Sequence, residues 1–447
     1  MAKTRDMTVG SPTKLIFGFF MPLLFGLLFQ QMYNAVDTVV VGRFLGVNAL
    51  AGVGATGALN FLILGFCTGT CTGFAIPVAQ KFGEHHFAGL KRYAVNAIMI
   101  SVAFSLVVGL LVSCLCRTFL VWMNTPADII DDAFAYLFVI FLGIPVVMLY
   151  NVLFGIIRSM GDSRTPVLYL IVASLINVAL DLLLIVVFHT GVEGAAIATV
   201  ISQAISALLC VRYIRHSQVL IITKEDWKVD WQCCKVLLGM GLPTGLQYSI
   251  TAIGSIMLQS ANNALGTACV AAFTAAMRIK MFFMCPFESL GMAMATYSGQ
   301  NYGAGKPERI WMGVKASTLM MIVYWAFTFC VLMFGARTFA LLFVDASELE
   351  ILKNTELFLH ISVSFFPVLG LLCILRYTIQ GVGYTNLAML SGVSEMIARI
   401  LVSLLAVPAF GYLAVCFGDP TAWIFADAFL IPAFIYVYRR ILRMKKN

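Results

Sequence analysis

Charged side chains are scarce in this sequence. They make up 11% of its 447 residues, whereas a typical soluble domain has about 25%. Hydrophobic residues reach 61%, and the mean hydropathy is +0.94. Too little polar side-chain surface remains to cover a soluble globule of this size. The composition therefore excludes a soluble multi-domain enzyme, and the abundance of apolar residues excludes a disordered protein.

Motifs for metal, nucleotide or nucleic-acid chemistry are also missing. The five histidines are scattered, so they predict no metal cluster, and no Ser/His/Asp or Cys/His arrangement appears. Lys306 follows Gly303 and Gly305 but lacks the rest of a phosphate-binding loop. The net charge of +8 comes without the clustered motifs of a nucleic-acid binder. We therefore expect no enzyme, no cofactor and no nucleic-acid partner.

The twelve cysteines do not form a disulfide pattern. Ten of them lie in or beside apolar runs, where cysteine behaves as a small buried hydrophobe. Cys233 and Cys234 are adjacent but lack the second pair that a zinc site needs. The N-terminal residues show no short apolar segment ending in a cleavage site, so we expect no signal peptide.

Long apolar runs dominate the chain instead. A membrane-spanning helix needs about 20 apolar residues, and reading between turns and charges gives twelve such runs. The sequence thus predicts an all-α integral membrane protein. The twelve expected spans are 15–41, 48–80, 93–116, 133–157, 166–188, 192–214, 236–262, 268–299, 311–335, 355–380, 386–410 and 418–438.

The basic residues predict the orientation of these spans. With the N-terminus in the cytoplasm, 22 of the 29 Lys and Arg residues fall in cytoplasmic loops and termini, Arg376 included. Only Arg43, Arg117, Arg337 and Lys353 clearly fall on the other side. Cytoplasmic loops carry the excess of positive charge in membrane proteins. We expect a multi-pass protein of the inner (plasma) membrane, with both termini in the cytoplasm.

The two halves of the chain repeat each other at an offset of about 220 residues. Leu45-Gly46 recurs as Leu265-Gly266, and the run 80–83 recurs as 300–303. Each half holds six spans, so both enter the membrane from the same side as parallel repeats. We expect an N-terminal lobe (1–215), a cytoplasmic linker (216–235) and a C-terminal lobe (236–447). The lobes form two six-helix bundles, related by a pseudo-two-fold axis along the membrane normal, with a cavity between them.

Polar residues at membrane depth gather in the first half. Asp37 lies about 35 Å and Asp181 about 22 Å from the cytoplasmic end, and Thr199 lies about 8 Å from the outer face. Asn177 shares a helix face with Asp181. These hard oxygen and amide ligands suit Na⁺ or a shared proton, since two close carboxylates are not both ionised cheaply. Two alternatives stay open: Asp37 is an interfacial aspartate near the outer mouth, and Asn177 caps Asp181 for structure alone.

The second half does not repeat this chemistry. Met257 occupies the position equivalent to Asp37, and Arg399 and Ser403 stand near the equivalents of Asn177 and Asp181. Glu395 is expected to pair with Arg399, four residues on. Glu288 either pairs with Arg278 or Lys280 or faces the cavity. As candidate residues of the substrate cavity we name Gln31, Tyr33, Asn34, Gln247 and Glu288.

The chain resembles the multidrug and toxic compound extrusion (MATE) family, in its DinF-like bacterial branch, over nearly its full length. The resemblance rests on the run 37–42 after Pro22 and on the repeated runs 80–83 and 300–306. It also rests on the loop 158–166 and on the runs 177–181 and 194–199. None of these motifs is specific alone, but together with twelve spans in two halves they are.

The resemblance implies antiport, in which inward Na⁺ or H⁺ drives organic cations and other drugs out. It places the ion site of this branch on Asp37, Asn177, Asp181 and Thr199, with the carbonyl of Ala195 as a further ligand. Spans 7 and 10 lack the acidic residues of the NorM-like branch, so a cation site in the second lobe is not expected. We expect a monomer in the lipid bilayer that carries small molecules. The alternative is a flippase of lipid-linked oligosaccharide or peptidoglycan precursors.

Overall fold

The computed structural model describes residues 4–123 and 125–446, which are helical almost throughout. The first half holds α1 (Pro12–Phe44), α2 (Val47–Ala55), α3 (Gly57–Gly83), α4 (Phe87–Trp122), α5 (Ile130–Leu142), α6 (Ile144–Ser159), α7 (Arg164–Asp181), the π-helical η1 (Leu182–Val187) and α8 (Val192–Arg215). The 3₁₀ turn η2 (Lys224–Asp226) follows. The second half holds α9 (Trp231–Asn263), α10 (Thr267–Gly303), α11 (Pro307–Ala340), α12 (Leu349–Ser364), α13 (Phe366–Gly381), α14 (Thr385–Leu401), the π-helical η3 (Val402–Ala406), α15 (Val407–Phe410), α16 (Tyr412–Cys416) and α17 (Gly418–Lys446).

The helices confirm an all-helical membrane protein. Ten spans among the described residues are long and apolar enough to cross a bilayer, and two pairs of bent helices raise the number to twelve. The first bent pair is α5 and α6, at 48°, and the second is α12 and α13, at 50°. The sequence predicted a continuous span in both places. Each bend lies just before a proline, Pro145 or Pro367, which has no N–H to continue the helical hydrogen bonds.

Backbone geometry repeats between the halves in the same way as the sequence motifs. Both π-helical segments occupy corresponding positions, η1 beginning at Leu182 and η3 at Val402. Turns in the left-handed region recur as well, at an offset of about 220 residues. The four pairs are Gly46 with Gly266, His85 with Gly305, Gly161 with Gly383, and His189 with Gly411. The repeat inferred from the sequence is therefore present in local structure.

The contacts divide the chain into two compact units. Unit 1 contains Met21–Gly245 and the described residues up to Met7, and unit 2 contains Thr8–Phe20 and the chain from Leu246 onward. The first nine residues of α1 belong to unit 2, and the first half of α9 belongs to unit 1. The boundaries therefore fall inside helices, whereas we predicted them at the ends of the segment 216–235.

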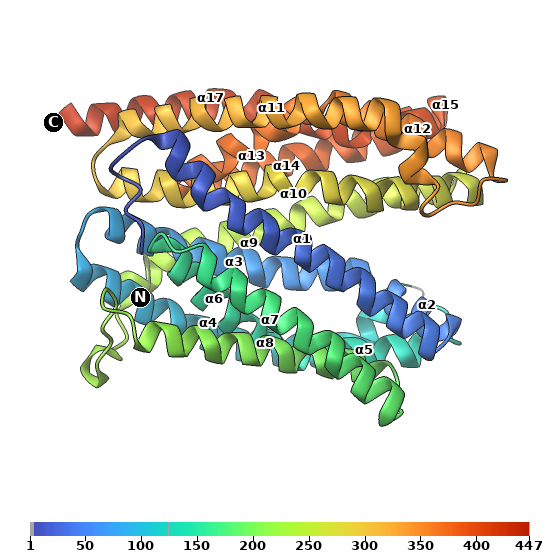
Figure 1. Ribbon diagram of the computed structural model, residues 1–447, viewed down its shortest axis with the longest axis horizontal. Coiled ribbons are helices and arrows are strands. Elements are labelled where there is room, and N and C mark those ends of the chain that lie inside the picture. The colour runs from blue at the N-terminus through green and yellow to red at the C-terminus, as the bar shows by residue number, and fades with distance from the viewer. Residues whose placement is uncertain (1–3, 124, 447) are drawn as a thin grey trace. The chain divides into compact units, whose positions relative to one another are not determined.

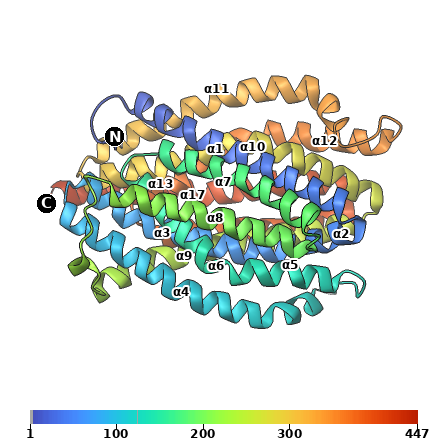
Figure 2. The same cartoon turned by 60° about the horizontal axis from the view of Figure 1, so that its bottom comes forward.

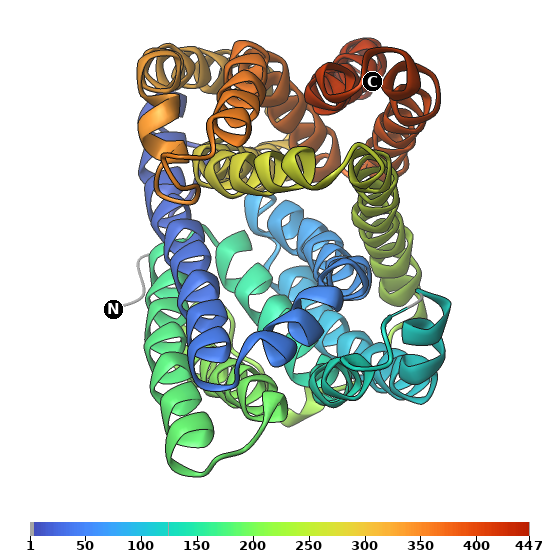
Figure 3. The ribbon, with the colours of Figure 1, turned by 90° about the vertical axis from the view of Figure 1, so that its right-hand side faces the viewer.

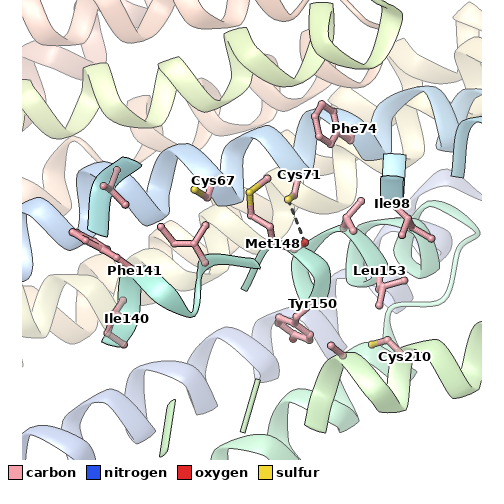
Figure 4. Packing of buried hydrophobic residues seen from close by; sticks show 14 of the residues in the cluster. Cys67, Cys71, Phe74, Ile98, Ile140, Phe141, Met148, Tyr150, Leu153 and Cys210 are labelled. Atoms are coloured by element: carbon pink, nitrogen blue, oxygen red, sulfur yellow. Dashed lines mark hydrogen bonds between the residues drawn. The ribbon is translucent and has the colours of Figure 1, made fainter. Parts of the chain in front are cut away.

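Helix α6 is central to unit 1, where it packs against α3, α4 and α8 (Figures 1 and 2). The apolar core follows these helices and includes the labelled side chains of Figure 4, where the Cys71 thiol donates to the carbonyl of Met148 at 3.5 Å. All twelve cysteines lie within the described ranges and are free thiols. Most of them are buried, which agrees with the role predicted for them.

The predicted linker packs against α4 of unit 1. Lys91 pairs with Asp226 at 3.0 Å, and the backbone N–H of Asp230 donates to Asn96 Oδ1 at 2.9 Å. Hydrogen bonds from Thr223 and then the Lys91 ammonium lower the pKa of Asp226 to about 2. The segment 216–235 is thereby attached to unit 1 by polar contacts.

In unit 2, α10 packs against α11, α12 and α13, and α14 pairs with α17 (Figure 3). Arg376 lies inside this bundle on α13, with 7% of its surface exposed. Counting it among the cytoplasmic loop charges was wrong. Its guanidinium pairs with the buried Glu395 of α14, a partner on another helix that the count of loop charges did not consider.

A substitution at Gly161, in the loop before α7, is expected to lower the stability of the protein strongly. Gly161 has φ +83°, and a Cβ there would lie 2.0 Å from the carbonyl oxygen of Arg5. Gly266 has φ +104°, and a Cβ there would meet no atom of the described residues within 4 Å. We expect Gly161→Ala to lower the melting temperature clearly more than Gly266→Ala, since both add backbone strain of about 1–3 kcal/mol but only the first displaces a chain segment. Equal losses in a thermal scan of purified protein would contradict this.

Candidate functional site

Helices α7 and α8 carry four of the five predicted ion-site residues. Asn177 and Asp181 lie on α7 and are 1% and 0% exposed. Asn177 Nδ2 donates to Thr199 Oγ1 of α8 at 3.4 Å, and that hydroxyl donates to the carbonyl oxygen of Ala195 at 3.1 Å. Asn177 therefore bonds to Thr199, and a capping bond to Asp181 is not formed. The amide, the hydroxyl and the Ala195 carbonyl form one short chain of hydrogen bonds.

The loop before α7 fixes the start of this helix. Asp162 Oδ1 accepts hydrogen bonds from the backbone N–H groups of Arg164 and Thr165, each at 3.0 Å. Its Oδ2 accepts one from the Tyr213 hydroxyl of α8 at 2.7 Å. A carboxylate that caps the first N–H groups of a helix stabilises that end. The motif 158–166 thus holds α7 and α8 together at one end and sets where Asn177 and Asp181 lie.

Asp37 of α1 joins the site from a third helix. Its carboxyl group interacts with that of Asp181, and the Tyr33 hydroxyl interacts with both. Tyr136 of α5 interacts with Asp37, Asp181 and Tyr33. Sequence reasoning missed Tyr136, although a tyrosine inside a predicted span was a signal that could have raised it. Four helices of unit 1 therefore contribute to one polar cluster.

Buried acceptor oxygens in this cluster lack hydrogen-bond donors. With both carboxyl groups ionised, no donor from the described residues reaches Asp37 Oδ1, Asn177 Oδ1, or either oxygen of Asp181. Buried polar atoms are nearly always satisfied, and leaving acceptors unpaired in a low-dielectric interior is costly. A bound hard cation or a proton would satisfy them, since both interact with oxygen acceptors.

The backbone at Asp181 is also unusual. This residue is the last of α7, and the π-helical η1 begins with the next residue. Single π-helical turns inside longer helices are rare and occur frequently at functional sites. The wider turn places a local irregularity directly beside the carboxylate.

The described ranges give no support for a site that binds a soft transition metal. They contain no group of three or more His, Cys, Asp and Glu side chains that could hold a metal ion. The cluster of Asp37, Asn177, Asp181 and Thr199 has only two carboxylates, and its other ligands are an amide and a hydroxyl. That donor set remains compatible with Na⁺ as well as with a proton.

The candidate cavity residues fall into two separate groups. In unit 1, Tyr33 lies at the carboxylate cluster, while Gln31 is half-buried and Asn34 is exposed on α1. In unit 2, Gln247 is buried and accepts a hydrogen bond from Gln380 at 2.5 Å. Glu288 is exposed on α10 and interacts with Tyr377 and Cys373.

Of the ion pairs predicted for unit 2, one is present and one is not. Glu395 contacts Arg399 at 3.4 Å, which confirms that predicted pair. Lys280 pairs with Asp419 of α17, so the alternative in which Lys280 pairs with Glu288 was wrong. Asp419 is the second residue of the predicted span 418–438 and was not considered, because its partners lie on two other helices.

Comparison with known families identifies one match. The family model described as MatE matches residues 22–183 and 243–405, once in each half of the chain. The probable multidrug resistance protein YpnP of Bacillus subtilis is 29% identical over 69% of both chains. DNA damage-inducible protein F of Escherichia coli is 25% identical over 90% of this chain and 87% of its own.

A solved structure shows the same fold. The outward-facing conformation of a multidrug resistance MATE family transporter of the MOP superfamily superposes with a TM-score of 0.91. That match covers 100% of this chain and 99% of the other, at 23% sequence identity. The fold expected from the sequence is thus confirmed along the whole chain.

Proposed function

Because the chain belongs to the MatE family of membrane transporters, we propose that it exports lipophilic, often cationic organic compounds in exchange for inward Na⁺ or H⁺. Proteins of this family are transporters and not enzymes. The observation that carries the proposal is the set of buried acceptor oxygens on Asp37, Asn177 and Asp181 that lack donors among the described residues. Such a set favours an ion as the missing partner.

Ion binding at this cluster supplies the driving step of the proposed mechanism. A proton or Na⁺ neutralises the paired carboxylates and changes how α1, α5, α7 and α8 pack around them. An ion shifts a conformational equilibrium only by its differential affinity for the two states. The cluster must therefore change shape between the inward-facing and outward-facing states of an alternating-access cycle. Pro22, inside α1, is our candidate for the hinge.

The test uses inverted membrane vesicles from cells that express the protein, with ethidium added outside. A Na⁺ gradient and a proton gradient, each high in the lumen, are imposed separately. We expect one gradient to drive ethidium into the lumen, above vesicles from cells without the protein. No uptake with either gradient, from a protein shown to be folded, would overturn the proposal and favour a lipid-linked precursor flippase.

Orientation and oligomeric state belong to the same proposal. Both termini are proposed to lie in the cytoplasm of a plasma-membrane protein that works as a monomer. Protease accessibility of tags at the two ends, compared in inverted and right-side-out vesicles, tests the orientation. Tags cleaved only in right-side-out vesicles would contradict it.

A further inference from the structure

A network of buried charges crosses unit 2. Glu395 of α14 accepts from Arg376 of α13 and, at 3.4 Å, from Arg399 of its own helix. Asp419 of α17 accepts from Arg399 Nε at 2.9 Å and from Lys280 of α10. All five side chains are buried, at 1% to 8% exposed. Four helices are therefore joined by one continuous set of ion pairs.

This network holds more cations than anions. Three basic groups, Lys280, Arg376 and Arg399, face two carboxylates, and every oxygen of Glu395 and Asp419 already has a basic partner. The Lys280 ammonium also lies 5.0 Å from the centre of the Phe358 ring and 5.8 Å from that of Trp423, both within cation–π distance. One positive charge remains without a compensating anion, and an uncompensated charge in the interior is costly.

Asp427 of α17 stands beside this network. It is 6% exposed and lies about 13 Å along the helix from Gly418. Its carboxyl group interacts with Arg376, Glu395 and Cys373. No hydrogen-bond donor among the described residues reaches its Oδ1. The carboxylate form of Asp427 therefore balances the network, whereas the protonated form leaves it with one positive charge.

Other elements packed against α17 direct their charged groups elsewhere. On α11, Glu308 pairs with Lys445, and on α12, Glu356 faces Arg337 at 4.0 Å. The titratable groups of α16, Tyr412 and Cys416, interact with Cys269, and Cys416 also interacts with Lys280 at the other end of the network. The segment η3 has no titratable side chain. Cys373 of α13 also interacts with Glu288 of α10.

We propose that Asp427 is a second ion site of this protein, in unit 2, and that it exchanges a proton with water but does not bind Na⁺. The proton bonds to a carboxylate oxygen of Asp427 and needs no other ligand. Na⁺ needs several oxygen ligands and a site of negative charge, whereas the first charged group that acts on Asp427 is the Arg376 guanidinium, a cation that repels Na⁺. The site in unit 1, in contrast, offers carboxylate, amide and hydroxyl oxygens together. A part for Asp427 in energy coupling rests on the proposed function, while the proton exchange itself does not.

Infrared difference spectroscopy of the purified protein between alkaline and acidic pH tests the proposal without drug or gradient. The measurement is made in the Asp37→Asn/Asp181→Asn variant, because the carboxyl groups of unit 1 would add a band of their own. We expect the carbonyl band of a protonated buried carboxyl to appear as the pH falls, with the same intensity at low and high Na⁺. The band is expected to disappear when Asp427→Asn is added to this variant. A band that survives that addition, or one that high Na⁺ removes, would overturn the assignment. Failure of ethidium transport would leave this measurement unaffected.

A second variant tests the charge balance itself. Arg376→Met leaves two basic groups facing two carboxylates, so the remaining network is neutral and no longer needs Asp427 as an anion. With Asp37→Asn/Asp181→Asn in both proteins, we expect the carbonyl band to persist after Arg376→Met at pH values where it is lost without that substitution. A titration identical with and without Arg376→Met would show that the surplus charge does not control Asp427. Gel filtration confirms that each variant is folded before its spectrum is taken.

Discussion

Replacing Asp37 by asparagine is expected to abolish gradient-driven efflux while the protein remains folded in the membrane. The amide has nearly the shape of the carboxyl group, so the packing of α1 is kept. The amide does not ionise and carries no negative charge for Na⁺, so neither a proton gradient nor a Na⁺ gradient can act on it. Asp181→Asn is expected to have the same effect, because the two carboxyl groups interact in one cluster.

Uptake of ethidium into inverted vesicles measures this loss. We expect transport by Asp37→Asn to fall to the level of vesicles without the protein. Asp131→Asn is the matched control, since its carboxylate lies in the first turn of α5 with 82% of its side chain exposed. The control should transport as the wild type does. Unimpaired uptake by a folded Asp37→Asn would remove this cluster from the coupling mechanism.

Breaking the charge network of unit 2 should have the largest effect on stability. Glu395→Gln removes the carboxylate that lies between Arg376 and Arg399 and leaves the two guanidinium groups without their common partner. Removing one partner of a buried ion pair typically costs about 3–5 kcal/mol. We expect Glu395→Gln to lower the melting temperature strongly, or to prevent recovery of folded protein in detergent.

Glu308→Gln gives the comparison for this loss. Glu308 pairs with Lys445 at 2.8 Å, but both side chains are about half exposed. Exposed ion pairs contribute little to stability, so this variant should melt close to the wild type. Thermal unfolding of both purified variants in one detergent makes the comparison. Similar melting temperatures for the two would show that the buried network contributes no more than a surface pair.

Most of the fold could be predicted from sequence because a bilayer restricts what a chain can do. Apolar runs of sufficient length must be helices there, and the spans follow from reading them off. The bends at Pro145 and Pro367 were less visible. Pro22, Pro77, Pro243 and Pro286 lie inside unbroken helices, so proline alone does not say where a span divides. The outcome depends on which neighbouring side chains satisfy the freed carbonyl groups.

The candidate site was predictable to the extent that its residues lie close in sequence. Asn177 and Asp181 share one helix face, and their spacing predicted this. Tyr136, Arg376 and Asp427 were missed because each matters through a partner on another helix. Arg376 stands alone among apolar residues, and counting loop charges alone placed it at the end of a span. Its burial becomes evident only when Glu395 is placed beside it.

The recurring backbone of the two halves has an evolutionary consequence. A duplicated gene that keeps its turns and π-helical segments preserves the frame while its buried polar positions drift apart. Asn177, with an acceptor that no described donor reaches, corresponds to Arg399, a cation with two bound carboxylates. The two halves therefore share recurring backbone features but differ in the charge of their buried polar positions. Grafting a site from one half into the other would require changing the whole charge environment, and not the corresponding residue alone.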